Sequence, residues 1–424
     1  MAADFIKRKT LLLLGGSQQQ VIAIEKAKEC GYRTILCDYL PDNPGQYVAD
    51  VFYQESTTDR EKILDIAMKE NIDGIVAYSS DPAAPTAAYV AEKLNLPTNS
   101  LQIVETLSNK HLFRDKLSEI GLPHPKSESF SADIPNEELE NLCSRLTFPI
   151  LIKPTDSSGS KGISRVASIE ELPQAVEIAL NHSRNNVLIA EEFIESSYPY
   201  IIGGDILVVD GKIVVWGLMD CIRDEQSSLI PVGKSYPASL DAESLSNLKQ
   251  TLQLLVSALG IEFGELNVEV LIGPEGTPYV LELGSRAGGN MIPLQISDIT
   301  GIDMVQANVM LAMGEKPKQF DNLDSSKDTL TSPTSQKYVT SYVLHSAENC
   351  IFEGVELSDL AQKSLYRKVI YKEPGDELYA FDGADKAVGI LFFEFESEEQ
   401  SKEFINNFKD HVKLISTAAD SKAQ

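Results

Sequence analysis

Apolar and polar positions alternate in blocks through the first hundred residues, where short apolar runs are separated by helical stretches. The predicted strands are residues 10–14, 34–38 and 74–78, and the predicted helices run to Cys30, from 58 to 70 and through Ala91. Strands that alternate with helices are typical of a parallel α/β unit. We therefore predict a small parallel α/β domain over residues 1–110.

The pattern changes after a predicted helical pair near residues 100–120. From about residue 148 to 312, the chain consists of long β segments with few helices. The dipeptide Asp210-Gly211 lies between two apolar runs and predicts a tight β-hairpin.

The last part of the chain indicates a further unit. Residues 319–336 are rich in Asp, Ser, Thr and Lys, which is typical of an exposed linker. Residues 337–424 are expected to form a β-rich domain closed by an amphipathic helix around 398–413. The fold class is thus expected to be multidomain, with α/β and α+β parts.

Charge and cysteine content limit the partners of this chain. Its 424 residues carry a formal net charge of −26, which disfavours nucleic acid and anionic membranes. The five cysteines are scattered and never in C-x-x-C spacing, so neither a disulfide framework nor a zinc site is indicated. The apolar run Leu11–Leu14 is too short for a signal peptide or membrane span. We expect a cytoplasmic protein.

Two glycine-containing loops suggest binding sites. Gly15-Gly16-Ser17 follows a strand but lacks G-x-G-x-x-G spacing, so it predicts a tight turn beside a substrate cleft rather than a nicotinamide site. The second loop, 155–162, follows a strand that ends in Lys153 and carries Lys161. Bare backbone N–H groups and two cations suit a polyphosphate, although a solvated Ser/Gly loop is the alternative.

The strand at residues 187–191 ends in two acids, Glu191 and Glu192. A strand edge can bind adenine through its backbone, with a carboxylate that accepts from the amino group. Solvated acids are the alternative.

The strongest local argument concerns a predicted hairpin with three polar residues. A four-residue loop over 273–276 would place Asn267 opposite Glu282. Glu269 would face Val280 and lie about 7–8 Å from Glu282 along the diagonal. All three would share one face, and two such carboxylates favour a Mg²⁺ ion carried with ATP phosphates. A solvent-facing sheet surface is the alternative, and an odd loop length would favour it.

Arg286 lies four residues after Glu282, within a glycine-rich stretch. Its guanidinium is well placed to hold a γ-phosphate or a substrate carboxylate, and the alternative is an ion pair with a nearby acid.

These segments, taken in order from Leu11 to Ala312, resemble the ATP-grasp superfamily, especially the branch with carbamoyl phosphate synthetase large chains, biotin carboxylase and amino-acid ligases. The most specific pieces are Asn267-Val268-Glu269 and Leu281-Glu282-Leu283-Gly284-Ser285-Arg286. The resemblance implies a pre-ATP-grasp domain over 1–110, a lid subdomain over 111–205 and a metal-binding subdomain over 206–318.

The resemblance also implies roles for individual residues. Phosphate contacts would come from Lys110 and Lys153, and the lid loop would comprise Ser157, Ser158, Gly159, Ser160, Lys161 and Gly162. Adenine would be framed by Glu191, Glu192 and Ile194. The metal ligands would be Glu269, Glu282 and Asn267, and Arg286 would face the reacting phosphate, with Lys153 and Lys161 as catalytic partners.

Two positions depart from the family pattern. Relatives usually carry Asn where this chain has Gly284, so Asn267 or Asn290 would substitute, or one ion would be held more loosely. The acid that often binds ribose is not obvious, and Asp205 is a weak candidate. No Met-Lys-Met carrier motif exists in this chain, which disfavours biotin carboxylase itself.

The expected activity is an ADP-forming carboxylate-amine ligation with ATP and Mg²⁺, through an acyl phosphate of a small carboxylate such as an amino acid or sugar acid. The alternatives are biotin carboxylase-like activation of bicarbonate and a non-catalytic ATP-binding regulator. The partners would be small molecules, and a homodimer is compatible with the sequence. The sequence names neither substrate, and Arg223 and Lys234 are candidates to contact them.

Overall fold

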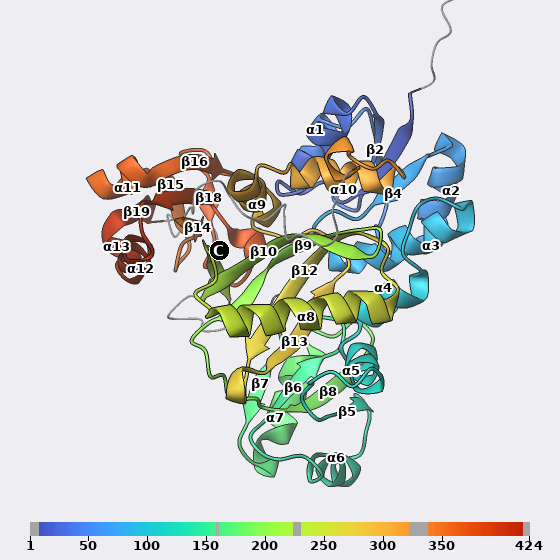
Figure 1. Ribbon diagram of the computed structural model, residues 1–424, viewed down its shortest axis with the longest axis vertical. Coiled ribbons are helices and arrows are strands. Elements are labelled where there is room, and N and C mark those ends of the chain that lie inside the picture. The colour runs from blue at the N-terminus through green and yellow to red at the C-terminus, as the bar shows by residue number, and fades with distance from the viewer. Residues whose placement is uncertain (1–7, 158, 160, 224–229, 322–337, 419–424) are drawn as a thin grey trace, which may run out of the picture.

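The computed structural model describes residues 8–157, 159, 161–223, 230–321 and 338–418. Figure 1 shows a long central sheet with the N-terminal domain at the upper right, a small sheet below and the C-terminal strands at the upper left. The predicted multidomain fold with α/β and α+β parts is confirmed.

The first domain is a parallel sheet with the strand order β3-β2-β1-β4. Its strands are β1 (Thr10–Leu14), β2 (Arg33–Asp38), β3 (Val51–Gln54) and β4 (Gly74–Val76), and its helices are α1 (Val21–Glu29), α2 (Arg60–Glu70) and α3 (Ala84–Leu94). The apolar strand β1 is buried along its whole length because it lies inside the sheet. The sequence pattern predicted these elements except β3.

A helical pair leads into a small antiparallel sheet. The pair is α4 (Leu101–Ser108) and α5 (Lys110–Glu119). The sheet has the order β5-β8-β6-β7, with β5 (Ser127–Ser131), β6 (Ile150–Pro154), β7 (Ser164–Val166) and β8 (Val187–Glu192), and it packs against α6 (Asn136–Cys143) and α7 (Leu172–Leu180).

An eight-stranded antiparallel sheet forms the centre of the protein, in the order β13-β12-β9-β10-β11-β14-β18-β16. Its strands are β9 (Ile201–Val209), β10 (Lys212–Arg223), β11 (Pro231–Tyr236), β12 (Phe263–Ile272), β13 (Pro278–Gly284), β14 (Tyr338–Leu344), β16 (Leu365–Ile370) and β18 (Gly389–Phe395). β9 and β10 form the predicted hairpin, since Asp210 and Gly211 both have positive φ. The sheet takes strands from both sides of residues 319–336, so the two units share one sheet.

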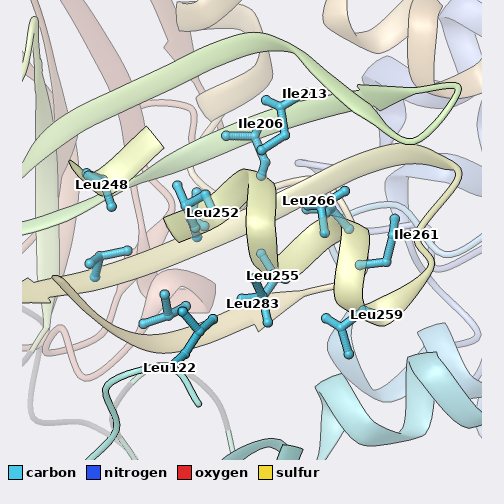
Figure 2. Packing of buried hydrophobic residues seen from close by; sticks show 14 of the residues in the cluster. Leu122, Ile206, Ile213, Leu248, Leu252, Leu255, Leu259, Ile261, Leu266 and Leu283 are labelled. Atoms are coloured by element: carbon cyan, nitrogen blue, oxygen red, sulfur yellow. The ribbon is translucent and has the colours of Figure 1, made fainter. Parts of the chain in front are cut away.

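The longest described helix, α8 (Ala242–Leu259), covers one face of this sheet. Figure 2 shows Leu248, Leu252 and Leu255 of α8 packed against strand residues such as Ile206 and Leu283. The expectation of few helices in this region is wrong here, and α9 (Ile292–Thr300) and α10 (Met304–Ala312) add two more.

The C-terminal strands extend the central sheet, and a second small sheet, β17-β15-β19, packs beside them. Its strands are β15 (Cys350–Leu357), β17 (Glu377–Leu378) and β19 (Val412–Ala418), and the helices are α11 (Asp359–Ser364), α12 (Glu398–Asn406) and α13 (Phe408–His411). The predicted single helix around 398–413 is corrected to α12 and α13, which break at Asn407 and are followed by a strand. In the described part of the chain, no helix is both long and apolar enough to cross a membrane.

Candidate active site

A cleft of about 800 Å³ lies where the domains meet. Its lining comes from the loops after β1 and β4, from α5 and β6 of the lid side, from the central sheet, and from the C-terminal residues 371–372 and 383–387. Residues far apart in the sequence therefore contribute to one site.

The acids Glu269 and Glu282 lie directly opposite each other on neighbouring strands of the cleft. The predicted register, with Asn267 opposite Glu282, is wrong, because Asn267 pairs with Gly284. Ile272 pairs with Pro278, so the loop comprises residues 273–277 and has an odd length.

A β-bulge at Leu281 corrects the effect of that odd loop. An uninterrupted ladder from the Ile272 and Pro278 pair would turn Glu269 and Glu282 to opposite faces of the sheet. Leu281 is an extra residue between Val280 and Glu282, and such a residue reverses the alternation of side chains. Both carboxylates therefore reach the cleft.

The surroundings of Glu282 disfavour its ionised form beside the neighbouring acids. Burial raises the pKa of Glu282, and Glu269 and Asp81 raise it further, although Lys110 and Arg286 oppose them. The Lys110 ammonium lies 3.8 Å from a Glu282 carboxylate oxygen. A divalent cation between Glu269 and Glu282 would relieve the repulsion, and oxygen ligands suit Mg²⁺.

Asn267 is fixed beside these acids by a buried carboxylate. Its side-chain amide donates to Asp205 over 2.7 Å, and the backbone N–H of Gly288 donates to the other Asp205 oxygen over 2.7 Å. Asp205 is fully buried. Asp205 thus joins β9 to the glycine-rich stretch after β13. The sequence made it a weak candidate for a ribose contact, and in the structure its carboxylate bonds to Asn267 and Gly288 instead.

Lys153 lies in a buried network rather than on the surface. Its ammonium pairs with Glu191, and the Arg114 guanidinium Nε donates to the same carboxylate over 2.7 Å. Burial alone raises the pKa of Glu191, but Arg114 and Lys153 outweigh it and hold that pKa well below its ordinary value. Burial lowers the pKa of Lys153, against the attraction of Glu191. One carboxylate therefore holds two cations in fixed positions.

The predicted phosphate loop is tied to helix α5. The Lys110 ammonium donates to the Ser157 carbonyl oxygen over 2.6 Å, and the Ser157 hydroxyl donates to the Lys161 carbonyl oxygen over 3.0 Å. Gly159 and Gly162 have positive φ, and a Cβ at Gly162 would lie 2.9 Å from the Pro154 ring. Ser158 and Ser160 lie outside the described residues.

Lys161 reaches across the cleft to the C-terminal domain, where its ammonium lies 3.8 Å from Asp385. Both side chains are about half exposed, so this ion pair contributes little to stability. No local pattern predicts this contact, because the two residues are far apart along the chain.

The three residues predicted to frame adenine, Glu191, Glu192 and Ile194, have separate contacts, and none of them lines the cleft. Glu191 is buried beneath Lys153, and Glu192 accepts a hydrogen bond from the Thr147 backbone N–H over 2.8 Å. Ile194 lies near Gly273 at the end of β12. Phe193, between them, lines the cleft together with Leu151.

Arg286 forms a two-point ion pair with Asp81 from the first domain. Both guanidinium-to-carboxylate distances are 2.7 Å, and Asp81 raises the pKa of Arg286 against the effect of burial. The ion pair that the sequence left open is thus present, and Arg286 still lines the cleft. A Cβ on Gly284 would lie 3.3 Å from Asp81, so this pair occupies the space beside residue 284.

The first glycine turn supports the cleft, as its sequence predicted. The Gly16 backbone N–H donates to the Asp38 carboxylate over 2.7 Å, so this acid holds the turn in place within the first domain. Ser17, Gln18 and Gln19 line the cleft, and the Gln19 side chain accepts from the Asn290 N–H over 2.6 Å.

Sequence reasoning missed Arg114 and gave Asp81 no role. Arg114 follows Lys110 by four residues on α5, so helical spacing places both on one face. That spacing was a usable signal. The partner of Asp81, however, is more than two hundred residues away, and no local pattern marks it.

Lys153→Met is expected to weaken ATP binding, whereas Lys161→Met is expected mainly to lower turnover. Lys153 is the next-to-last residue of β6 and is buried, which holds it rigidly, so we expect its loss to raise the Kd for MgATP roughly tenfold or more. Lys161 is half exposed, and its substitution should lower kcat with a smaller change in Kd. Titration calorimetry and steady-state kinetics separate the two effects, and the opposite assignment of effects would contradict this division.

Comparisons with known proteins give the family and the fold of the chain. The family model described as carbamoyl-phosphate synthase L chain, ATP binding domain, matches residues 109–320, half of the chain. The carbamoyl phosphate synthase large chain of Archaeoglobus fulgidus is 22% identical over 338 residues, which are 74% of this chain and 30% of that relative. The chain thus spans less than a third of that protein.

Two solved structures share the fold over nearly the whole chain. The L-amino acid ligase from Bacillus licheniformis has a TM-score of 0.78 with 22% identity, over 97% of this chain and 99% of the ligase. The biotin carboxylase domain of Hydrogenobacter thermophilus 2-oxoglutarate carboxylase, solved with MgADP, ADP and bicarbonate, has a TM-score of 0.75 with 17% identity, over 96% and 91% of the two chains. The chain belongs to the ATP-grasp superfamily, and within it to the family with the carbamoyl-phosphate synthase L chain ATP-binding domain.

Proposed function

We propose that this protein is an ADP-forming carboxylate-amine ligase, which activates a small carboxylate as an acyl phosphate and passes the acyl group to an amine. The observation that carries the proposal is the direct pairing of Glu269 and Glu282 in a cleft that also contains Lys110, Lys153 and Arg286. Two acids surrounded by fixed cations suit a reaction in which anions must approach one another.

The family sets the general chemistry. ATP-grasp proteins are ATP-dependent enzymes, mostly ADP-forming carbon-nitrogen ligases, and their ATP is bound with magnesium. The substrates are the part that we propose here. A cytoplasmic location and a homodimer remain predictions.

The residues present fit a magnesium ion. Glu269 and Glu282 would be its protein ligands, and the Asn267 side chain is held beside them by Asp205. The donor set is oxygen, as Mg²⁺ prefers. When bound, the ion would neutralise charge on the ATP phosphates and on the group in transfer.

Our proposed reaction has two steps. In the first, a carboxylate oxygen forms a bond to the γ-phosphorus as the bond from that phosphorus to the β-γ bridging oxygen breaks, and ADP leaves. In the second, the amine nitrogen attacks the acyl carbon, the amine loses a proton, and inorganic phosphate leaves. Lys110 and Lys153 would position the phosphates, and Arg286 would stabilise the charge that develops during transfer.

A screen of carboxylates tests the proposal. Purified protein with MgATP is offered amino acids, sugar acids and bicarbonate, each with and without a panel of amines, and ADP release is measured. Bicarbonate is included because one structural relative was solved with it. Carboxylate-dependent ADP release is the expected result. ATP binding without such release from any carboxylate would favour the non-catalytic alternative.

ATP is expected to protect the protein from heat only when Mg²⁺ is present. Ligand that binds the native state adds about 2.7 kcal/mol of stability at a hundredfold excess over Kd. Without the ion, the phosphates would meet Glu269 and Glu282 with their repulsion uncompensated. Thermal melts with ATP, in excess Mg²⁺ or in excess chelator, make the comparison. Equal protection in both conditions would contradict the metal assignment.

A further inference from the structure

Lys234 differs in its surroundings from four other cations that line the cleft. Within the described residues, Lys110, Lys153, Lys161 and Arg286 each lie within 4 Å of a carboxylate. Lys234 is only 7% exposed, lines the same cleft, and donates to the Cys221 thiol over 2.6 Å. A thiol is a weak acceptor, and among the described residues no carboxylate bonds directly to this ammonium.

Lys234 extends toward the metal-binding acids across a neighbouring strand. Its own strand, β11, is two positions from β9 in the sheet, and β9 lies beside β12 with Gly203 opposite Glu269. A Cβ at Gly203 would lie 2.5 Å from the Lys234 nitrogen, so the ammonium lies above β9 at the place that a side chain would fill. Adjacent strands are about 4.8 Å apart, which puts this charge about one strand from Glu269.

Lys234 and the lid-side lysines lie on opposite sides of Glu269 and Glu282. Lys110 and Lys153 belong to the lid side. Lys110 lies 3.8 Å from Glu282 at the β13 edge, where Arg114 also donates to the Leu281 carbonyl oxygen. Lys234 approaches from the other side, past β9. In phosphoryl transfer the leaving and attacking oxygens lie roughly in line, on opposite sides of the transferred phosphorus. With ADP on the lid side, the acceptor belongs beside Lys234.

We propose that Lys234 binds the carboxylate that is to be activated and holds its oxygen toward the transferred phosphoryl group. This inference rests on the proposed function. A fixed ammonium favours an anionic acceptor over a neutral alcohol, because the neutral group would leave a buried charge uncompensated.

Two polar atoms in the cleft narrow the class of carboxylate. The Asn290 side-chain oxygen and the Tyr371 hydroxyl are buried, and neither has a hydrogen-bond partner among the described residues. Buried polar atoms are normally satisfied, so each is suited to a polar group of a ligand. The carboxylate is therefore an acid that also carries an amino or hydroxyl group, such as an amino or hydroxy acid, and not a plain fatty acid.

The test compares wild-type protein, Lys234→Met and a matched control, Lys249→Met. Lys249 belongs to α8 and lies over the Trp216 ring, outside the cleft. Its substitution by Met removes the same charge as Lys234→Met. The probes are the twenty amino acids, lactate and hexanoate, added to the MgADP complex in thermal melts and to MgATP in ADP-release assays. For the most effective probe, Lys234→Met is expected to raise the half-effective concentration roughly 10- to 100-fold, with an unchanged Kd for MgADP.

The outcomes separate this inference from the proposed function. An unchanged Kd for MgADP shows that the variant is folded. An unchanged probe dependence in Lys234→Met, or equal losses in probe and MgADP binding, would overturn the role of Lys234. A response to hexanoate alone, or to no probe in the wild type, would overturn the substrate class. Probe-dependent melts without ADP release would reject the ligase function while the binding role of Lys234 stands.

Discussion

Glu282→Gln is expected to abolish ADP formation while the fold stays intact. The amide has nearly the shape of the carboxylate but lacks its charge, so Glu269 alone would face the metal. We expect kcat to fall by roughly a hundredfold to a thousandfold or more, as when an electrostatic contact to the transition state is removed. The measurement is ADP release with saturating MgATP, together with the thermal melt of the variant without ligand.

Glu275→Gln is the matched control for that experiment. Glu275 lies in the loop of the same hairpin, is exposed and does not line the cleft. Its substitution makes the same chemical change outside the site and should leave activity near the wild-type level. Retention of most ADP formation in Glu282→Gln would show that the paired acids do not hold the catalytic metal.

The hairpin shows how much of the site the sequence could predict. The shared face of Glu269, Glu282 and Asn267 was predicted from a four-residue loop, and all three side chains do line one cleft. The register was wrong, because the loop is one residue longer and a bulge at Leu281 restores the face. Loop type and bulges depend on the neighbouring strand and packing, which alternation of apolar residues does not encode.

Helix α8 was not predicted, although its sequence carries a helical pattern. Its buried residues recur at helical spacing, from Leu248 through Leu252, Leu255 and Leu259, so the signal was present in the chain. The gap between the hairpin β9-β10 and β12 was long enough for it. Strands β1, β2 and β4 of the first domain were predicted more easily, because their short apolar runs are bounded by glycines and polar residues.

The buried ion-pair network could not be predicted from local pattern. Glu191 ends a strand with a second acid, which is equally typical of a solvated edge or an adenine contact. Its actual partners, Lys153 and Arg114, come from another strand and from α5. These contacts depend on how β6, β8 and α5 pack against one another, which the sequence of each element alone does not encode.

Arg286→Met is expected to suppress both ADP formation and the acyl phosphate intermediate. With carboxylate, MgATP and no amine, the wild type should hold an acyl phosphate that hydroxylamine intercepts as a hydroxamate. The transfer brings two anions together in a protein of net charge −26, so it depends on the local cations. We expect ADP and hydroxamate to fall together, by roughly a hundredfold or more. Both are measured in the same reaction mixture.

Asp81→Asn separates the charge of Arg286 from its orientation. The guanidinium stays charged in this variant but loses an ionic partner that fixes it with two hydrogen bonds of 2.7 Å. If Arg286 acts by a precisely placed charge, Asp81→Asn should lower both products by less than Arg286→Met, and Arg286→Lys should rescue little because lysine lacks the planar fork. Full activity in Arg286→Met would remove this residue from the transfer step. A stable phosphate ester without hydroxamate, from any substrate that drives ADP formation, would mean that the acceptor is a hydroxyl and that the protein is a kinase on the same fold.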